Sequence, residues 1–215
     1  SCMHTDAAVL SFHPVKLICA GEGGAVLTND SELARRVRRL RSHGIERPPA
    51  HALPPGEGGW YYEQQELGFN YRMTDLQAAL GRSQLGRLAA FIDRRRELAR
   101  RYIAALNDVR FRAVWHVPEF RPDSAYHLFV VHFRSAGLRL CAYDWLARCG
   151  IRAQVHYIPV YRHPHYARGG GFDPLPGAEA FYQGCLSLPL YPKLNDSEQD
   201  RVIEQLFAFA AEVSG

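Results

Sequence analysis

The chain has 215 residues, of which 47% are hydrophobic and 22% charged, with a formal net charge of +4. This composition excludes a disordered or fibrous protein, because there is ample apolar area to bury against the entropy of ordering. No apolar run approaches the roughly 20 residues that span a bilayer, and residues 1–6 lack the features of a signal peptide, so no membrane partner is expected.

Two residue types bear on the compartment and on the chemistry. The five cysteines include no C-x-x-C pair, which argues against a disulfide framework or a zinc site and favours a reducing cytoplasm. Lys16 and Lys193 are the only lysines, and the other basic residues are arginines. A lysine that lies outside a solvated helix face is therefore conspicuous in this chain.

The first predicted elements are two short strands. Residues 7–12 are an apolar run typical of a buried strand, and residues 25–28 form another after a glycine turn at 21–24. Between them, residues 17–20 continue an extended pattern after a loop that carries Lys16.

A helix is predicted next, with Asp30 as its N-cap and Gly44 at its end. One of its faces is strongly basic and holds Arg35, Arg36, Arg38, Arg39 and Arg41. This face suits either a nucleic-acid patch or a solvated helix surface, and we favour the solvated surface, with no nucleic-acid partner.

Residues 45–63 are rich in proline and glycine and predict a long irregular loop, of the kind that is usually functional or mobile. Thr74 and Gln77 match a capping box, which predicts the start of a long helix that runs to Leu106 and joins two domains.

The remaining residues predict an α+β pattern. Strands are expected at 126–133 and 153–157, a helix at 138–149 closed by Gly150, a loop at 159–177 and a last amphipathic helix from about Asp196.

The segment with the clearest chemistry runs from Ser11 to Lys16, with the glycine turn beyond it. It places a hydroxyl and an amine at the end of a predicted buried strand. Burial favours a neutral amine, which can attack a carbonyl, and a strand-end hydroxyl can donate to a phosphate. On chemistry alone, a loop lysine with its ammonium in water remains the simpler interpretation.

The same segment resembles the cofactor-lysine segment of the DegT/DnrJ/EryC1/StrS nucleotide-sugar aminotransferases, which use pyridoxal phosphate (PLP). The similarity continues in order along nearly the whole chain, in blocks at residues 11–16, 21–30, 41–45, 67–79, 94–96, 150–161 and 186–192. Within the family, the sequences of residues 11–16 and 154–161 most resemble those of the branch that makes 4-amino-4,6-dideoxy sugars in a pseudaminic acid-type pathway.

The resemblance implies an α/β fold, the C-terminal part of a fold-type-I PLP-dependent aminotransferase. Residues 1–84 would be the C-terminal part of the large PLP-binding α/β/α domain. Residues 85–215 would be a linking helix and a small α+β C-terminal domain.

The resemblance also implies roles for individual residues. Lys16 would carry PLP covalently and later move a proton between substrate and cofactor, and Ser11 would hydrogen-bond the cofactor phosphate. Asn70 would reach the cofactor phosphate of a neighbouring subunit, so that a homodimer shares its sites. Arg72 is a candidate for an anionic group of the substrate or the amino donor.

The sugar nucleotide would lie against residues after a small-domain strand, namely Gln154, His156, Tyr157 and Ile158. For His156, a structural histidine bonded at a strand end is the alternative interpretation. No metal ligand set is expected, because the histidine pair His163/His165 and the cysteine pair Cys141/Cys149 lack further ligands.

Several parts of such a site are missing from this sequence. The family supplies an aspartate for the pyridine nitrogen, a ring that stacks on the cofactor and a phosphate-binding turn before the lysine segment. Only ten residues precede Ser11 here, and Asp6 lies too near Lys16 to match the aspartate. The chain is therefore expected to be the C-terminal part of a longer enzyme.

The function expected is transamination of a UDP-4-keto-6-deoxy-N-acetyl-hexosamine, with glutamate as the amino donor. Two alternatives remain, an aminotransferase for a different nucleotide keto-sugar and a truncated, non-catalytic or regulatory module. Family members that dehydrate sugars replace the lysine with histidine, so Lys16 argues against that reaction.

Overall fold

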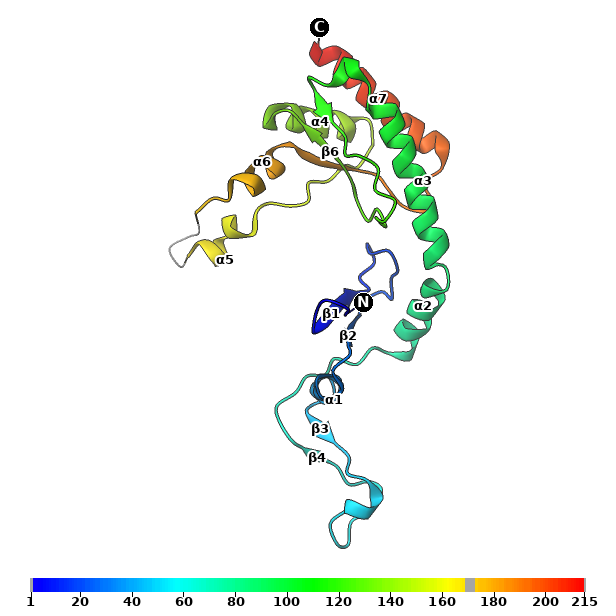
Figure 1. The fold of residues 1–215 in the computed structure, drawn as a ribbon, viewed down its shortest axis with the longest axis vertical. Coiled ribbons are helices and arrows are strands. Elements are labelled where there is room, and N and C mark those ends of the chain that lie inside the picture. Colours follow the sequence, from blue (N-terminus) through cyan, green and yellow to red (C-terminus); the bar gives the residue numbers. More distant parts are fainter. Residues whose placement is uncertain (1, 169–172, 215) are drawn as a thin grey trace. The chain divides into compact units, whose positions relative to one another are not determined.

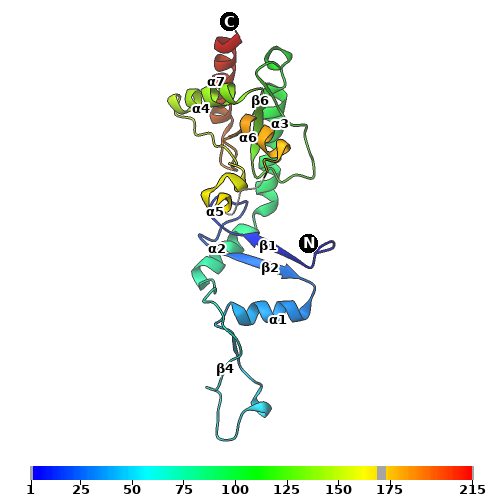
Figure 2. The same cartoon turned by 90° about the vertical axis from the view of Figure 1, so that its left-hand side faces the viewer.

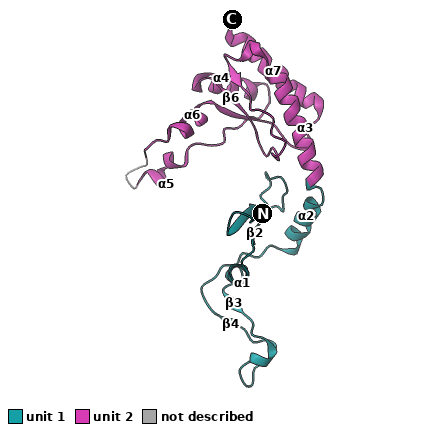
Figure 3. Cartoon of the chain, viewed as in Figure 1, with its two compact units in different colours: residues 1–88 teal, residues 89–215 magenta. Residues whose placement is uncertain are grey.

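The computed structural model describes residues 2–168 and 173–214, which fall into two compact units, residues 1–88 and 89–215 (Figure 3). The domain boundary that the sequence predicts, between residues 84 and 85, stays a prediction. No helix among the described residues is long and apolar enough to cross a membrane.

The first unit contains two hairpins and two helices (Figures 1 and 2). Its elements are β1 (Ala7–Ser11), β2 (Gly24–Thr28), α1 (Ser31–Leu40), β3 (Ile45–Glu46), the 3-10 turn Ala50–Ala52, β4 (Glu63–Gln64) and α2 (Asp75–Leu85). β1 pairs antiparallel with β2, with Ser11 opposite Gly24, and β3 pairs antiparallel with β4.

The β1–β2 hairpin departs from the sequence prediction in two ways. Residues 17 and 18 form a bend and residues 19 and 20 are irregular rather than a strand, because the chain folds back on itself between the two strands. The predicted burial of the first strand is also wrong for the described residues, since Val9 is 80% exposed. Among the described residues of this unit, only Ala20 and Gly44 are buried.

α1 begins as predicted, because the Asp30 carboxylate accepts hydrogen bonds from the backbone N–H groups of Glu32 and Leu33. The helix ends at Leu40, earlier than predicted, and Gly44 follows in a left-handed turn with φ of +71°. A Cβ at Gly44 would collide with the carbonyl oxygen of Glu66. The glycine therefore serves a close backbone approach rather than the helix end itself.

The basic face of α1 is partly neutralised by acidic residues. Arg39 pairs with both Glu46 and Glu66, and Arg35 pairs with Glu46 and Glu32. These pairs favour the solvated helix surface over a nucleic-acid patch, because much of the positive charge already has partners within the unit.

The capping box at the start of α2 is confirmed, with the Thr74 hydroxyl accepting from Gln77 N and the Gln77 side chain accepting from Thr74 N. The predicted single long helix is wrong. α2 ends with Gly86 as its C-cap, and a separate helix α3 (Leu88–Leu106) follows. Glycine has low helix propensity, which accounts for a break at this position.

The second unit has one antiparallel sheet covered by helices (Figure 1). The sheet order is β5 (Trp115–His116), β6 (Phe129–Phe133) and β7 (Cys185–Leu188). The other elements are the 3-10 turns Val109–Phe111 and Val160–Arg162, and the helices α4 (Ala136–Arg148), α5 (Pro164–Ala167), α6 (Pro176–Gly184) and α7 (Asp196–Ser214).

Predicted and observed elements agree better at the helices of this unit than at its strands. α4 ends before Gly150, which has φ of +73°, and α7 starts at Asp196 as expected. The strand predicted at 153–157 is wrong, because this segment makes only an isolated bridge between Gln154 and Ser187. Residues 169–172 of the loop predicted at 159–177 lie outside the described residues.

The core of the second unit lies between the sheet and the helices. β6 presents Phe129, Val131 and Phe133 to it, each at most 1% exposed, and the residues between them are half-buried. α3 and α7 contribute apolar stripes that include Tyr102 and Leu206. Burial of aliphatic and aromatic side chains, at about 1.5–3 kcal/mol each, is the main source of stability here.

A buried arginine ties three parts of this core together. Arg95 on α3 is 5% exposed and its Nη1 donates to the carbonyl oxygens of Tyr126, His127 and Leu190, at 2.9 to 3.2 Å. Burial lowers the pKa of this guanidinium. The arginine thus joins α3 to the segments before β6 and after β7.

Replacing Arg95 with methionine should lower the free energy of unfolding by about 2 kcal/mol, because buried carbonyl groups lose their donor while the apolar stem is kept. The measurement is urea unfolding followed by tryptophan fluorescence. Arg152→Met is the control, since Arg152 is exposed and has no hydrogen bond or ion pair to the described residues. Equal stability of the two variants would contradict this role for Arg95.

Candidate functional site

Lys16 lies in a loop that the β1–β2 hairpin closes. The backbone N–H of Phe12 donates to the carbonyl of Gly23, and that of Ala20 donates to the carbonyl of Phe12, both at 2.9 Å. Because these bonds sit directly beyond the Ser11–Gly24 strand pair, residues 12–23 form a closed loop at the end of the hairpin.

The C-terminal end of this loop packs against α2 and against Met73, two residues before that helix. Ala20 is 1% exposed, and a Cβ at Gly81 of α2 would lie 3.5 Å from the Ala20 Cβ. A Cβ at Gly23 would lie 3.0 Å from the Met73 side chain. Small residues therefore permit close approach here and fix the loop against the rest of the unit.

The two residues predicted to act on the cofactor, Ser11 and Lys16, both belong to this loop region. Ser11 is exposed at the end of β1, and its hydroxyl oxygen accepts from the backbone N–H of His13 at 3.4 Å. Lys16 is half-buried, and its ammonium makes no hydrogen bond or ion pair to the described residues. A hydroxyl thus ends the strand that enters the loop, and an amine lies within the loop.

Asp6 is placed away from this region. It precedes β1, whereas Ser11 ends it, so the strand separates the two by about 17 Å at 3.4 Å per residue. That Asp6 is not the carboxylate for a cofactor ring nitrogen stays a prediction.

Asn70 and Arg72 lie in an extended segment beside the end of α1. Asn70 bridges Ser42, and the backbone N–H of Tyr71 donates to the carbonyl of Arg41 at 2.9 Å. The side chains of Asn70 and Arg72 are exposed. No hydrogen bond joins either of them to Ser11 or Lys16 in the described part of the chain.

The residues expected to bind the sugar nucleotide follow one another in the second unit. Gln154 exchanges two backbone hydrogen bonds with Ser187 of β7, at 2.7 and 3.1 Å. His156 Nδ1 lies 2.8 Å from the Ser187 hydroxyl. Tyr157 is 67% exposed and Ile158 46% exposed, so these two side chains face outward from an anchored backbone.

Ser187 was not singled out in the sequence. It is 5% exposed, within a strand whose four residues are all buried, and it holds both Gln154 and His156. The signal for it was the serine in the apolar run Leu186-Ser187-Leu188, since a buried hydroxyl needs a hydrogen-bond partner. The hydrogen bond at Nδ1 thus supports the interpretation of His156 as a structural histidine. Binding of the sugar nucleotide by His156 stays a prediction.

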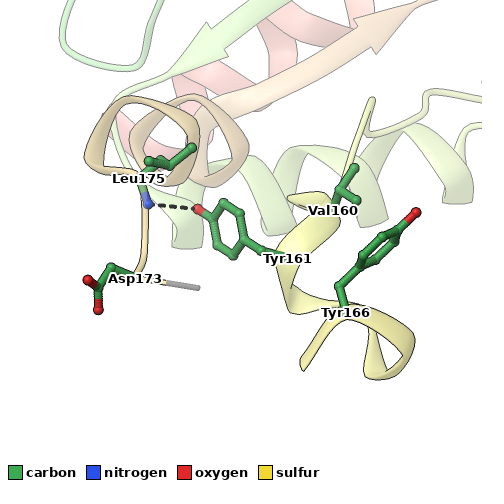
Figure 4. A pocket seen from close by; sticks show the side chains of 5 residues that line it. All are labelled: Val160, Tyr161, Tyr166, Asp173 and Leu175. Carbon is green, nitrogen blue, oxygen red and sulfur yellow. Dashed lines mark hydrogen bonds between the residues drawn. The ribbon is translucent and has the colours of Figure 1, made fainter. Parts of the chain in front are cut away.

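A hollow of about 520 Å³ lies just beyond this segment (Figure 4). Its described lining is Val160, Tyr161, Tyr166, Asp173 and Leu175. Tyr161 points across it and donates to Glu179 at 2.7 Å, while its hydroxyl accepts from the Leu175 N–H at 3.2 Å.

Glu179 forms the polar anchor next to this hollow. Hydrogen bonds from the Tyr161 hydroxyl and then from Arg162 hold the pKa of the Glu179 carboxyl below its ordinary value. Burial and the bond to Glu179 raise the pKa of Tyr161. The tyrosine therefore stays neutral and keeps its ring at the hollow, where an apolar or ring-shaped group could pack.

The chain belongs to the DegT/DnrJ/EryC1/StrS aminotransferase family, whose profile matches residues 1–207. It is 36% identical over 207 residues to spore coat polysaccharide biosynthesis protein SpsC of Bacillus subtilis, covering 93% of this chain and 52% of that protein. It is also 36% identical over 191 residues to the UDP-4-amino-4,6-dideoxy-N-acetyl-beta-L-altrosamine transaminase of Helicobacter pylori, covering 88% of this chain and 48% of the relative.

Among solved structures, Helicobacter pylori PseC, an aminotransferase involved in the biosynthesis of pseudoaminic acid, matches with a TM-score of 0.87 and 30% identity, over 97% of this chain and 54% of that one. The chain thus spans about half the length of the curated relatives it matches. Its two units are part of the α/β fold of these aminotransferases, which confirms the predicted fold class.

The contact between Ser187 and His156 can be measured with a double-mutant cycle. Ser187→Ala, His156→Ala and the double variant should give a coupling free energy of about 1 kcal/mol in urea unfolding, because either single variant already removes the partly buried hydrogen bond and the double variant does not remove it a second time. Histidine NMR of Ser187→Ala should show increased ring motion of His156. If the changes in the free energy of unfolding of the two single variants simply add up in the double variant, the contact is contradicted.

Proposed function

We propose that the chain is the lysine-bearing part of a PLP-dependent nucleotide-sugar aminotransferase, with Lys16 as the cofactor lysine. The observation that carries the proposal is the closed loop 12–23, which holds one of only two lysines in the chain and directly follows Ser11 at the end of β1. Membership of an aminotransferase family supports the same chemistry.

The side chains of the first unit fit two ends of PLP. An amine such as Lys16 can bond to the cofactor aldehyde, and hydroxyl and carboxamide groups such as Ser11 and Asn70 can donate to its phosphate. When bound, PLP would act as the electron sink for a carbanion at the substrate carbon. In this proposal Asn70 acts on the site of a second copy of the chain, so the working form is a homodimer.

Lys16 would have two tasks in this site. Its Nζ would first hold the cofactor, and once an amino substrate had displaced it, the neutral amine would carry a proton between the substrate carbon and the cofactor. The half-buried position of Lys16 suits both tasks, because the residue is neither fully solvated nor closed off from a substrate. Ser11 would keep its place throughout and donate a hydrogen bond from its hydroxyl to the phosphate.

The second unit would bind and orient the sugar nucleotide through Gln154, His156, Tyr157 and Ile158. The anchoring of this segment on Ser187 supports the proposal, because binding residues on a fixed backbone lose little entropy on binding. Arg72 would bind an anionic group, either a nucleotide phosphate or the carboxylate of glutamate, the proposed donor.

The proposed substrate is a UDP-4-keto-6-deoxy-N-acetyl-hexosamine, which fits the printed name of the Helicobacter pylori relative. A different nucleotide keto-sugar is the second candidate, because SpsC is equally identical at 36% and its name refers to spore coat polysaccharide. The proposed setting for either reaction is the cytoplasm, where activated sugars would be available.

Amino transfer from ¹⁵N-glutamate to a panel of UDP- and dTDP-linked keto-sugars tests the function, with the labelled amino sugar detected by mass spectrometry. We expect transfer to the UDP-4-keto sugar by a full-length form of the enzyme that contains this chain and by its Lys193→Ala variant, and a loss of at least about 10³-fold in its Lys16→Ala variant, typical of removing a catalytic proton carrier.

Three results would contradict parts of this proposal. Transfer only to dTDP sugars would exclude the proposed substrate in favour of the second candidate. Full activity of Lys16→Ala would exclude Lys16 as the catalytic lysine. Absence of transfer to every sugar would favour a non-catalytic module.

A further inference from the structure

We propose that His13 is a positioning residue for Lys16, and that Glu22 holds the His13 ring in the orientation this requires. The inference rests on the proposed function of Lys16 and extends it to two side chains to which the family resemblance described above assigns no role. His13 and Glu22 lie on opposite arms of the loop 12–23, close to its neck.

His13 begins the turn that delivers Lys16. The backbone N–H of Lys16 donates to the carbonyl of His13 at 2.9 Å, which makes residues 13–16 a β-turn. Pro14 occupies the second position of this turn, where its fixed φ is favoured. This hydrogen bond to the His13 carbonyl therefore fixes the position of the Lys16 backbone N–H.

The imidazole of His13 adds a second anchor to the same turn. Its Nδ1 accepts a hydrogen bond from the backbone N–H of Val15 at 3.4 Å. This arrangement, in which the side chain of the first turn residue accepts from the N–H two residues on, is the one that Asn and Asp use to stabilise turns. It fixes the peptide plane between Pro14 and Val15, directly before Lys16.

The anchor requires one tautomer of histidine. Nδ1 can accept only if it carries no proton, so in the neutral ring the proton must lie on Nε2. His13 Nε2 lies 3.9 Å from the Glu22 carboxylate, which favours a proton on that nitrogen. Both side chains are substantially exposed, so this contact adds little stability by itself, and its effect is on the ring.

Glu22 is brought to this position by glycines on both sides. Gly21 has φ of +79° and Gly23 has φ of +145°, conformations that other residues rarely adopt. Gly23 also lies against Met73, and Ala20 lies against α2. The part of the loop that carries Glu22 is thus fixed to the rest of the unit. The His13–Glu22 contact links the part that carries Lys16 to this fixed part.

The first test measures the turn without cofactor. His13→Phe keeps a ring but removes the acceptor, whereas His13→Asn keeps an acceptor for the Val15 N–H. We expect the amide exchange rate of Val15, measured by NMR on the full chain, to rise about threefold in His13→Phe, as for loss of one exposed hydrogen bond, and to stay near the wild-type rate in His13→Asn.

The second test measures Lys16 itself. The chain is incubated with PLP, reduced with borohydride and digested, and the ratio of modified Lys16 to modified Lys193 is determined by mass spectrometry. Lys193 is exposed in the other unit and serves as the internal standard. We expect this ratio to fall about threefold in His13→Phe and to be retained in His13→Asn.

The outcomes separate the inference from the proposed function. If His13→Phe and His13→Asn give the same Val15 exchange rate or the same labelling ratio, the positioning role of His13 is wrong. If the wild-type chain shows no preference for Lys16 over Lys193 while the exchange rates differ as expected, the proposed function fails and the turn anchor stands.

Glu22 is tested in both backgrounds. Glu22→Ala should raise the Val15 exchange rate when His13 is present and leave it unchanged in His13→Asn, where no imidazole needs orienting. An equal rise in the two backgrounds would show that Glu22 acts on the loop independently of His13.

Discussion

Two backbone hydrogen bonds at the neck of the loop 12–23 are the constraint that places Lys16. They run from Phe12 N–H to the Gly23 carbonyl and from Ala20 N–H to the Phe12 carbonyl, and they continue the strand pairing of Ser11 with Gly24. Without them the residues between the strands would be a free connection, and an amine in it would have no defined position. With them, the amine and the strand-end hydroxyl belong to one local structure.

The two units hold their functional residues by different physical means. In the first unit only Ala20 and Gly44 are buried among the described residues, so Lys16 depends on backbone hydrogen bonds, glycine contacts and the His13 turn. In the second unit a continuous core supports β7, and the buried Ser187 on that strand holds Gln154 and His156. Positions in the second unit should therefore tolerate surface substitutions better than those around Lys16.

The sequence predicted features that depend on local chemistry. The Asp30 cap, the Thr74–Gln77 capping box and the start of α7 follow from residue types a few positions apart, and the structure has all three. The Ser11 to Lys16 segment was found because lysine is rare in this chain and because the segment resembles a known family. These signals need no knowledge of distant contacts.

Features that depend on distant contacts were missed. The segment 153–157 has a strand-like pattern, yet only Gln154 finds a partner strand, and the true strand at Cys185–Leu188 pairs with β6. Ser187 likewise contacts His156, which lies 31 positions away in the sequence. The role proposed for Glu22 depends on His13, on the other side of the loop. Gly44 was assigned to a helix end because its approach to Glu66 cannot be read from its neighbours.

A crystal structure of a full-length form of the enzyme that contains this chain, with bound PLP, tests most directly whether Lys16 is the cofactor lysine. The account predicts continuous density from Lys16 Nζ to the cofactor and the phosphate within hydrogen-bond distance of the Ser11 hydroxyl. Cofactor density at Lys193, or at a place remote from the loop 12–23, would contradict it.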